Sequence, residues 1–592
     1  MNGVTKAKMN GGTKGKTYAA KSAKGRIVNY RPALSCALAL VAGILFAFSV
    51  TYRRVPSMIA VIIGFTALAA TCVFLSPKNG KFVPARLIAL LLFFSLGAGE
   101  FLVYRKNYRS EFYSGEKEVF AKITERRDYS VGTFFVFDDL SFDGKSASGK
   151  LVMFVYTNYD SSFSEIADRL KEGDLIGFGA QISTNTSWLE TKDDGSIANR
   201  AYYWREDIRY EAEKCRNLRF AGSNANAFEK IRAKLKTTLF SSMNEDAAAV
   251  SYALLTGETS EMNEELLENI RYGGIAHIFA VSGLHIGALF AFLATLFKTK
   301  KFSFVPPFVR WLVVAALLVF YGGVCGYSAS VIRAAVMCLV FYADTLLGFK
   351  RDGTDSLGKA AIVVLVLSPI SVFDAGFLLS FSAVAGIFFL APPLERCMNA
   401  VFFREKKASE SGNAVAEKIP TESEAKTENN ADTADGMKTI TAIKTESPAK
   451  NFLKKCVAFF CVTLSATLFT FPILSVCFSY ASGAALLLNV LVVPLVSACF
   501  AVFLALAFLA CIVAPLAKII LYVPSVLISL LTTFFYAFDF SSSAVALRFT
   551  PIAILAYYAA LFLSGDKIRL KPPVRIALVS CCALAFVLSF AL

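Results

Sequence analysis

Long apolar runs separated by shorter polar segments make up most of the chain. A run of about 20 apolar residues is long enough for a helix to cross a bilayer. Three such runs come first, at about 33–51, 57–75 and 85–104, and more follow from residue 273 to the end of the sequence. The whole pattern predicts about 12–13 transmembrane helices, and therefore a polytopic α-helical membrane protein.

The pattern changes between residues 105 and 225, where short stretches alternate apolar and polar positions. Gly132–Phe137, Gly149–Tyr156 and Asp174–Ile182 are separated by turn residues, so they are predicted to be β-strands of a small inserted β domain. The next segment, 226–272, has apolar residues at helical spacing between charged ones. It is predicted to form amphipathic helices near the outer membrane surface.

Composition supports the membrane assignment, because 55% of the 592 residues are hydrophobic and 54 are Phe. The formal net charge is +16, and residues 1–32 hold eight Lys or Arg without any acidic residue. Basic segments tend to stay in the cytoplasm, so this tail is predicted to be cytoplasmic and disordered. Helices 33–104 then place the β domain outside. A polar insert at 404–451 is predicted to be a disordered cytoplasmic loop.

Metal and cofactor chemistry has little support in the sequence. The chain has 13 Cys without a C-x-x-C zinc motif, and only two His. We therefore expect no metal site and no cofactor.

Both His lie in one stretch, Gly273–Phe297, which starts with a glycine pair and continues as a nearly unbroken apolar run. The run is long enough to be one membrane helix. Gly283 and Gly287 are four apart, so they share a helix face and allow another helix to approach closely. Three polar side chains lie in the first half of the stretch: His277, Ser282 and His285. Polar groups inside a membrane usually face a bundle interior or a wet cavity.

The sequence here resembles the ComEC family, inner-membrane channels that carry single-stranded DNA into competent bacteria. The resemblance is carried by ALLTGETSEMNEELLENIRYGG, by GIAHIFAVSGLHIG and by the Arg-Ala-x-x-Met helix in YSASVIRAAVMCLVFYADTLLGFKRD. It continues in TLFTFPILSVCFSYASGAALLLNVLVVPLV and in GFLLSF, where Leu378 stands in place of the family's Gln. It extends over roughly residues 33–540.

The resemblance implies a channel domain over 230–540, interrupted by the insert, and further membrane helices over 541–592. It also implies that the 105–225 domain is OB-like, and OB folds often bind single strands through basic grooves and aromatic platforms. Aromatic residues are present: Phe154, Tyr156, Tyr159, Trp188, Tyr202, Tyr203 and Trp204. A basic excess is missing, because the domain has 18 basic and 20 acidic residues. Burial of the aromatic rings in the domain core is the alternative.

Four further residues are candidates for a polar path through the membrane. Arg333 and Asp344 are eleven residues apart, close to three helical turns, and so lie on one helix face. A charge in a membrane must be paired or wet, which leaves two alternatives: a structural ion pair or a pore-lining cation. Ser380 and Asn489 complete the set.

Two prolines flank Asn489 in the sequence. Pro472 and Pro494 both lie within apolar runs, which predicts broken helices with freed backbone groups. Such breaks are tolerated at membrane depth where protein or a cavity satisfies the backbone.

The predicted function is an inner-membrane channel for single-stranded DNA in natural transformation, with a cytoplasmic N-terminus. The predicted pore-lining residues are His277, Ser282, Gly283, His285, Arg333, Asp344, Ser380 and Asn489. Many ComEC proteins continue into a metallo-β-lactamase-like domain, but no His follows His285 here. That domain is therefore expected to be absent. The expected partners are single-stranded DNA, the lipid bilayer, a DNA receptor, a cytoplasmic motor, a separate nuclease and further copies of the chain.

Three alternatives compete with this prediction. His277, Ser282 and His285 are also suited to hydrogen bonds that hold helices together. An intramembrane serine protease needs a base aligned with Ser282, but the sequence Ala-Val-Ser-Gly-Leu is no nucleophile elbow and His285 lies on the same helix. We therefore expect no catalytic residues. Transport of another polymer or of a solute stays open.

Overall fold

The structure is a computed structural model of the chain. It describes residues 31–51, 55–74, 83–108, 114–129, 132–156, 169–184, 203–279, 283–299, 304–348, 352–403, 448–478, 480–546, 549–565 and 572–588. Residues 1–30 of the predicted N-terminal tail and 404–447 of the predicted insert lie outside these residues.

Three apolar helices come first: α2 (Pro32–Thr51), α3 (Val55–Phe74) and α4 (Val83–Asn107). They confirm the three predicted N-terminal helices. α2 and α4 cross closely because each has a glycine at the contact. A Cβ atom on Gly43 would overlap the carbonyl of Phe94, and one on Gly97 would overlap the carbonyl of Leu40. Only a residue without a side chain permits this crossing.

The inserted domain is a β-barrel. Its strands are β1 (Gly115–Tyr129), β2 (Gly132–Phe142), β3 (Lys145–Ser146), β4 (Lys150–Tyr156), β5 (Asp174–Thr184) and β6 (Ile208–Ser223). The order in the sheet is β1-β5-β6-β4-β2-β3, and β1 also pairs with β2, which closes the sheet on itself. β4 and β6 run parallel. Val119, Phe135 and Phe137 are fully buried in the barrel core. The three predicted strands are confirmed.

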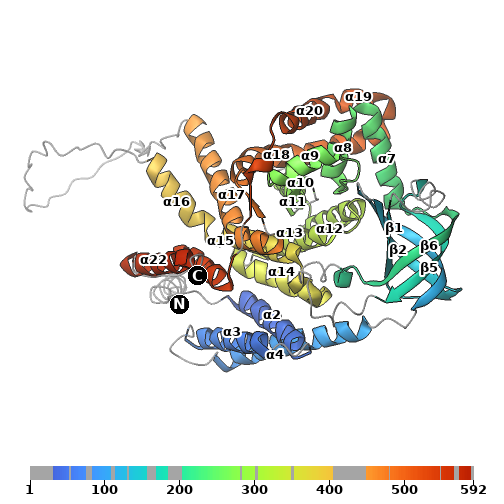
Figure 1. The fold of residues 1–592 in the computed structure, drawn as a ribbon. Helices are drawn as coiled ribbons and strands as arrows, with labels where there is room; N and C mark the ends of the chain where they lie inside the picture. The colour runs from blue at the N-terminus through green and yellow to red at the C-terminus, as the bar shows by residue number, and fades with distance from the viewer. Residues whose placement is uncertain are drawn as a thin grey trace, which may run out of the picture.

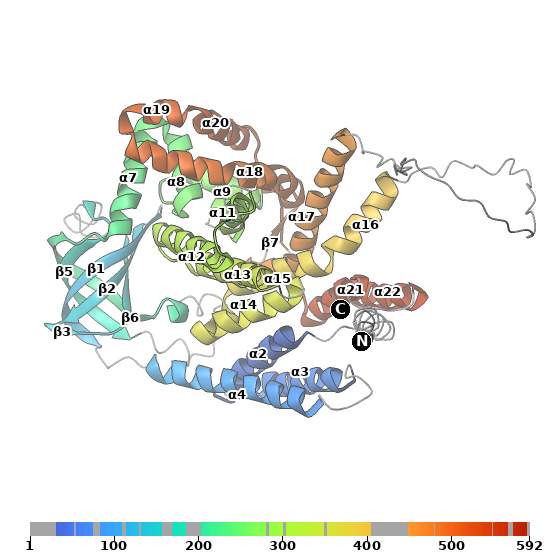
Figure 2. The same cartoon turned by 180° about the vertical axis from the view of Figure 1, so that it is seen from behind.

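Three helices follow the barrel: α7 (Ala227–Ser242), α8 (Glu245–Thr256) and α9 (Glu264–Tyr272). Both views place α7 beside the barrel (Figures 1 and 2). α7 has the expected amphipathic pattern, with Leu235 and Leu239 buried. α8 does not, because every residue from Ala247 to Thr256 is buried. The prediction of a surface helix is wrong there, since α8 is rich in small apolar residues that pack on all sides.

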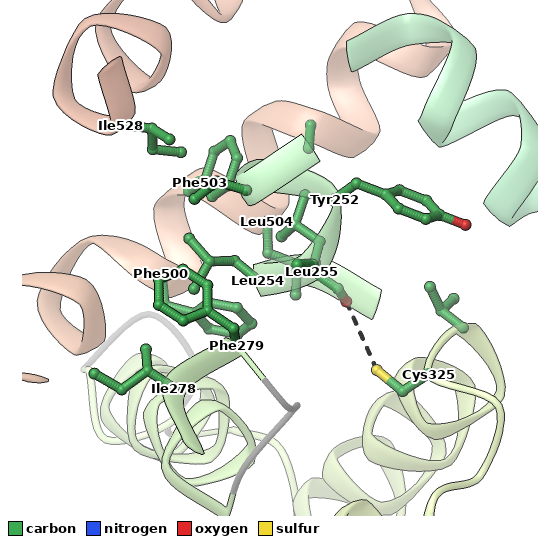
Figure 3. Packing of buried hydrophobic residues seen from close by; sticks show 14 of the residues in the cluster. Tyr252, Leu254, Leu255, Ile278, Phe279, Cys325, Phe500, Phe503, Leu504 and Ile528 are labelled. Atoms are coloured by element: carbon green, nitrogen blue, oxygen red, sulfur yellow. Dashed lines mark hydrogen bonds between the residues drawn. The ribbon is translucent and has the colours of Figure 1, made fainter. Parts of the chain in front are cut away.

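α8 lies in the largest hydrophobic cluster of the described chain. Figure 3 shows Leu254 and Leu255 of α8 close to Phe503 and Leu504 from the C-terminal half of the chain. The carbonyl of Leu255 accepts a hydrogen bond from the Cys325 thiol at 3.7 Å. The segment just after the barrel is thus built into the membrane part of the protein.

The remaining elements are α10 (Ala276–Phe279), α11 (Gly283–Leu296), α12 (Pro307–Val324), α13 (Ala329–Leu346), α14 (Gly353–Leu367), η3 (Pro369–Phe373), α15 (Ala375–Phe389), α16 (Ala391–Phe402), α17 (Pro448–Phe478), β7 (Tyr480–Ser482), α18 (Ala485–Ile512), η4 (Ala514–Leu516), α19 (Ala517–Ile520), α20 (Tyr522–Ala537), η5 (Ser541–Ser543), β8 (Ala544–Ala546), α21 (Pro551–Ser564) and α22 (Pro572–Leu588). Among the described residues, six helices are long and apolar enough to cross a membrane, or eight if each of two bent pairs is one span. The fold is that of a polytopic helical membrane protein. The length criterion gives fewer spans than predicted because several apolar helices are short.

Two local predictions are wrong. The stretch 273–297 does not begin as a helix, because residues 273–275 form a turn before α10. α10 ends at Phe279 and α11 begins at Gly283, and residues 280–282 lie outside the described residues. Conversely, α17 continues through Pro472 and α18 continues through Pro494. Each helix can retain a proline where neighbouring side chains satisfy the freed carbonyl groups.

Candidate functional site

Five helices of the membrane part form a ring. α11 packs on α13, α13 on α15, α15 on α17, α17 on α18, and α18 returns to α11. Within the described part of the chain, no helices on opposite sides of this ring pack as extensively as neighbours do. Figure 2 shows α18, α17, α15 and α13 following one another around the middle of the membrane part. Such an arrangement is suited to a polar path across a membrane.

α11 contributes His285 and Gly283 to this ring. His285 is fully buried, and its ring lies 4.4 Å from that of Phe500 on α18. A Cβ on Gly283 would meet the Ala334 Cβ of α13 at 3.5 Å, an ordinary contact. Gly287 faces open space, with nothing within 4 Å of a Cβ built there. The predicted close approach at Gly287 is therefore wrong.

His277 lies on α10, and the residue is exposed. The turn that precedes it requires glycine, because Gly274 has a φ of +73°. A Cβ there would also come within 2.5 Å of the Ala485 Cβ at the start of α18. The two His thus lie on separate helices, and Ser282 between them is outside the described residues.

Arg333 and Asp344 lie on one face of α13 but have different partners. Arg333 is 4% exposed, and its Nη1 donates to Asp374 Oδ2 at 2.8 Å. Asp344 accepts from Lys359 Nζ of α14 at 2.6 Å and from the Ser356 hydroxyl at 2.5 Å. Arg333 is thus an ion-paired residue in this conformation, with a partner on the loop before α15.

Asp374 is the N-cap of α15, where its carboxylate also accepts from the backbone N–H of Phe377 at 3.1 Å. Its other oxygen, Oδ1, lies 2.6 Å from Nη1 of Arg205, which belongs to the β domain. Gly376 makes room for this cluster. A Cβ on Gly376 would lie 2.6 Å from Arg333 Nη2.

Ser380 and Asn489 also lie on ring helices. Ser380 is half-buried on α15. Asn489 on α18 is 8% exposed, and its side-chain oxygen has no hydrogen-bond partner among the described residues. The adjacent Leu488 side chain touches the glycine turn, 3.0 Å from a Cβ placed on Gly273. An unsatisfied buried amide oxygen is suited to a water or a ligand.

α17 adds hydroxyl groups that we did not predict from the sequence. Thr463, Ser465 and Ser475 are all buried on this helix. Pro472 has no N–H, so the carbonyl of Leu468 loses its helical donor. The Tyr557 hydroxyl of α21 replaces that donor at 2.9 Å. The ring thus has a hydroxyl-rich member.

A comparison with known families decides the classification. The family model described as Competence protein matches residues 254–568, which is more than half of the chain. The chain belongs to the Competence protein family. This confirms the resemblance seen in the sequence, and all five ring helices lie within the matched residues.

Curated relatives of this Competence family chain match over shorter stretches. ComE operon protein 3 of Bacillus subtilis (strain 168) is 30% identical over 137 residues, 23% of this chain and 17% of that protein. Competence protein ComA of Neisseria gonorrhoeae is 28% identical over 152 residues, 24% of this chain and 21% of that protein. Uncharacterized protein YcaI of Escherichia coli (strain K12) is 25% identical over 145 residues, 24% of this chain and 19% of that protein. This chain thus matches about a fifth of each relative's length. No solved structure matches it.

Two charged residues of the candidate site in this Competence family member were not predicted from the sequence. Asp374 carries a recognisable signal, since it directly precedes the apolar helix with the GFLLSF motif and so stands at an N-cap position. Arg205 carries none, because its partner is 169 positions away in the chain. Within the described ranges, no three His, Cys, Asp or Glu side chains form a group that could hold a metal ion.

Proposed function

We propose that this protein is a cell-membrane channel that carries single-stranded DNA into the cytoplasm during natural transformation. Membership of the Competence family supports a role in DNA uptake. The observation that carries the proposal is the helix ring, because candidate residues from distant parts of the sequence lie on four of its five helices or, for His277, directly before α11.

The chemistry of the ring fits a nucleic acid backbone. His277, Asn489, Ser380 and the α17 hydroxyls offer hydrogen bonds that do not depend on base identity. Contacts to phosphate and sugar position a strand without reading its sequence. Arg333 supplies a cation, but Asp374 neutralises it in this conformation. Contact with phosphate therefore requires Arg333 to exchange or share its partner.

The barrel is proposed to be an OB-like domain on the outer face that receives the strand. Its closed sheet with one parallel pair, β4 and β6, supports this assignment. A groove of about 430 Å³ on β1, β5 and β6 includes Phe120, Arg216 and Arg219. Phe120 is 50% exposed and is suited to stacking on a base. Trp204 is not such a platform, because it is 2% exposed.

The proposed setting is the inner membrane of a bacterial cell, with the N-terminus in the cytoplasm. A DNA receptor outside, a motor and a nuclease from other chains, and further copies of this chain are the proposed partners. Membrane insertion itself agrees with the long apolar helices.

The test is DNA uptake per inserted molecule in a strain that lacks its own copy. His277→Ala is the first variant, because the residue is exposed and lies shortly before α11 of the ring. We expect uptake to fall several-fold at near-normal abundance in the membrane. Leu487→Ala is the matched control, since Leu487 is 73% exposed on α18 and offers no polar group.

Two contrasting variants sharpen the result. His285→Ala is expected to lower abundance, because it leaves a hole beside Phe500 in a packed interface. Arg333→Gln should lower uptake per molecule if Arg333 meets phosphate, and abundance alone if it is only structural. Unchanged uptake per molecule in both His277→Ala and Arg333→Gln would refute the proposed path.

A further inference from the structure

Asp374 binds two guanidinium groups from different parts of the molecule. Arg333 comes from α13 in the ring, and Arg205 comes from the barrel. The Asp374 side chain is 10% exposed, that of Arg333 is 5% exposed, and that of Arg205 is 18% exposed. A carboxylate shared by two cations in a buried site holds each of them less strongly than it would hold one alone.

The barrel presents Arg205 from a firmly held turn. The neighbouring Trp204 packs among aromatic rings of α4, with centroid distances of 6.1 Å to Tyr104 and 5.7 Å to Tyr108. The Tyr104 hydroxyl donates to the Trp204 carbonyl at 2.7 Å, and the Tyr108 hydroxyl to the Ile208 carbonyl at 2.5 Å. Arg205 therefore reaches Asp374 only while the barrel stays docked on α4.

The charges in the cluster divide along the domain boundary. Arg205 also contacts Glu206 of the barrel at 3.0 Å. If the barrel moved away, Arg205 would leave together with Glu206 and with Lys150, which lies 3.6 Å from Glu206. Asp374 would then bind Arg333 alone. With the barrel docked, Oδ1 of Asp374 pairs with Arg205 and Oδ2 pairs with Arg333, so the attraction of Asp374 is divided between two cations.

The position of Asp374 gives this sharing a mechanical consequence. Its carboxylate caps the first turn of α15 through the Phe377 N–H. Gly376, in the same turn, lies against Arg333. A shift of the carboxylate toward Arg205 or toward Arg333 must therefore move the start of α15 relative to α13, two neighbouring helices of the ring.

We propose that Asp374 is the coupling point through which the docked barrel sets the spacing of α13 and α15 and the charge that Arg333 presents to the ring. The spacing part stands on the ion cluster alone, whereas the charge part rests on the proposed function. In this arrangement, a strand that binds the barrel outside changes the position of α15 inside through the Asp374 carboxylate. The partner of the Arg333 guanidinium during transport would be a phosphate of the strand.

The test measures the α13–α15 spacing directly in full-length protein in lipid nanodiscs. Spin labels are attached through unnatural amino acids at Ile332 and Leu378, which are 42% and 38% exposed and flank the cluster. Dipolar broadening is compared between the parent, Arg205→Gln and Arg127→Gln. Arg127 is the matched control, because it also binds a barrel carboxylate at 2.6 Å, that of Glu125, but is 41% exposed and lies outside the groove. We expect Arg205→Gln to change the broadening and Arg127→Gln to leave it unchanged.

Identical broadening in Arg205→Gln and the parent, with the protein folded, would overturn the coupling. Arg205→Lys keeps the test decisive if Arg205→Gln fails to fold, since it retains the charge with fewer donors and should give a smaller change of the same kind. The label experiment uses no DNA. A changed broadening with unchanged uptake per molecule would therefore support the coupling and contradict the DNA path.

Discussion

At the scale of single residues, one glycine in the site is required by a buried charge beside it. Gly376 lies beside the buried Arg333 guanidinium, which is held by Asp374 and has little room to retreat. Gly376→Ala should destabilise the folded protein by about 1–3 kcal/mol, because the new methyl group overpacks this site. The measurement is thermal unfolding of the purified protein. Gly287→Ala is the control and should be neutral or slightly stabilising, since nothing lies within 4 Å of that position. Equal stability of both variants would contradict the tight contact.

The partner of Arg333 shows what residue patterns do not determine. Helical spacing placed Arg333 and Asp344 on one face, but each pairs with a residue from another segment. Spacing along one helix tells which side chains point the same way, not which neighbouring helix they meet. Six of the eight candidate residues lie on ring helices, whereas the partners of their side chains required the structure.

At the scale of elements, α17 depends on a neighbour to pass through Pro472. Tyr557→Phe removes the donor that satisfies the Leu468 carbonyl and should cost about 1–3 kcal/mol of stability. Tyr558→Phe is the matched control. The Tyr558 hydroxyl donates to the Phe469 carbonyl at 2.8 Å, but the Ser382 hydroxyl also donates there at 2.7 Å. The control should therefore lose less. A larger loss in Tyr558→Phe, by thermal unfolding, would show that the proline does not set the requirement.

Element prediction succeeded where periodicity was strong and failed where tertiary packing decided. The helices α2 and α4 and the alternating strands β2, β4 and β5 follow their sequence patterns. The short helix α10 ends at Phe279 and α11 begins at Gly283, and the apolar pattern of 273–297 did not separate these two elements. α8 has charged residues only in its first turn, and its burial follows from packing by later segments of the chain.

At the scale of the whole molecule, the barrel is fixed at a second place besides Asp374. Arg232 of α7 binds Glu172 of the barrel at 2.7 Å, and Lys122 of β1 lies 3.4 Å from Glu229 of α7. Glu258, after α8, faces the same cluster and accepts from the Tyr252 hydroxyl at 3.0 Å. The Glu258 charge thus acts on the Arg232–Glu172 pair at the junction of the barrel with the membrane part.

This junction should respond to pH. The pKa of Glu172 is raised from 4.5 to about 7, mainly by burial and then by the Glu258 charge, against the opposing effect of Arg232. Because the docked state binds this proton more tightly than an exposed Glu, docking should strengthen as pH falls from 7.5 to 6 and weaken as pH rises through 7.

The measurement is the unfolding temperature followed by Trp204 fluorescence, since Trp204 lies between the barrel and α4. Glu172→Gln should raise that temperature at pH 7.5 and flatten its pH dependence. Glu116→Gln, at a barrel carboxylate that is 71% exposed, should leave the pH dependence intact. A parent protein that loses stability between pH 7.5 and 6 would show instead that the ion pair with Arg232 dominates and keeps Glu172 charged.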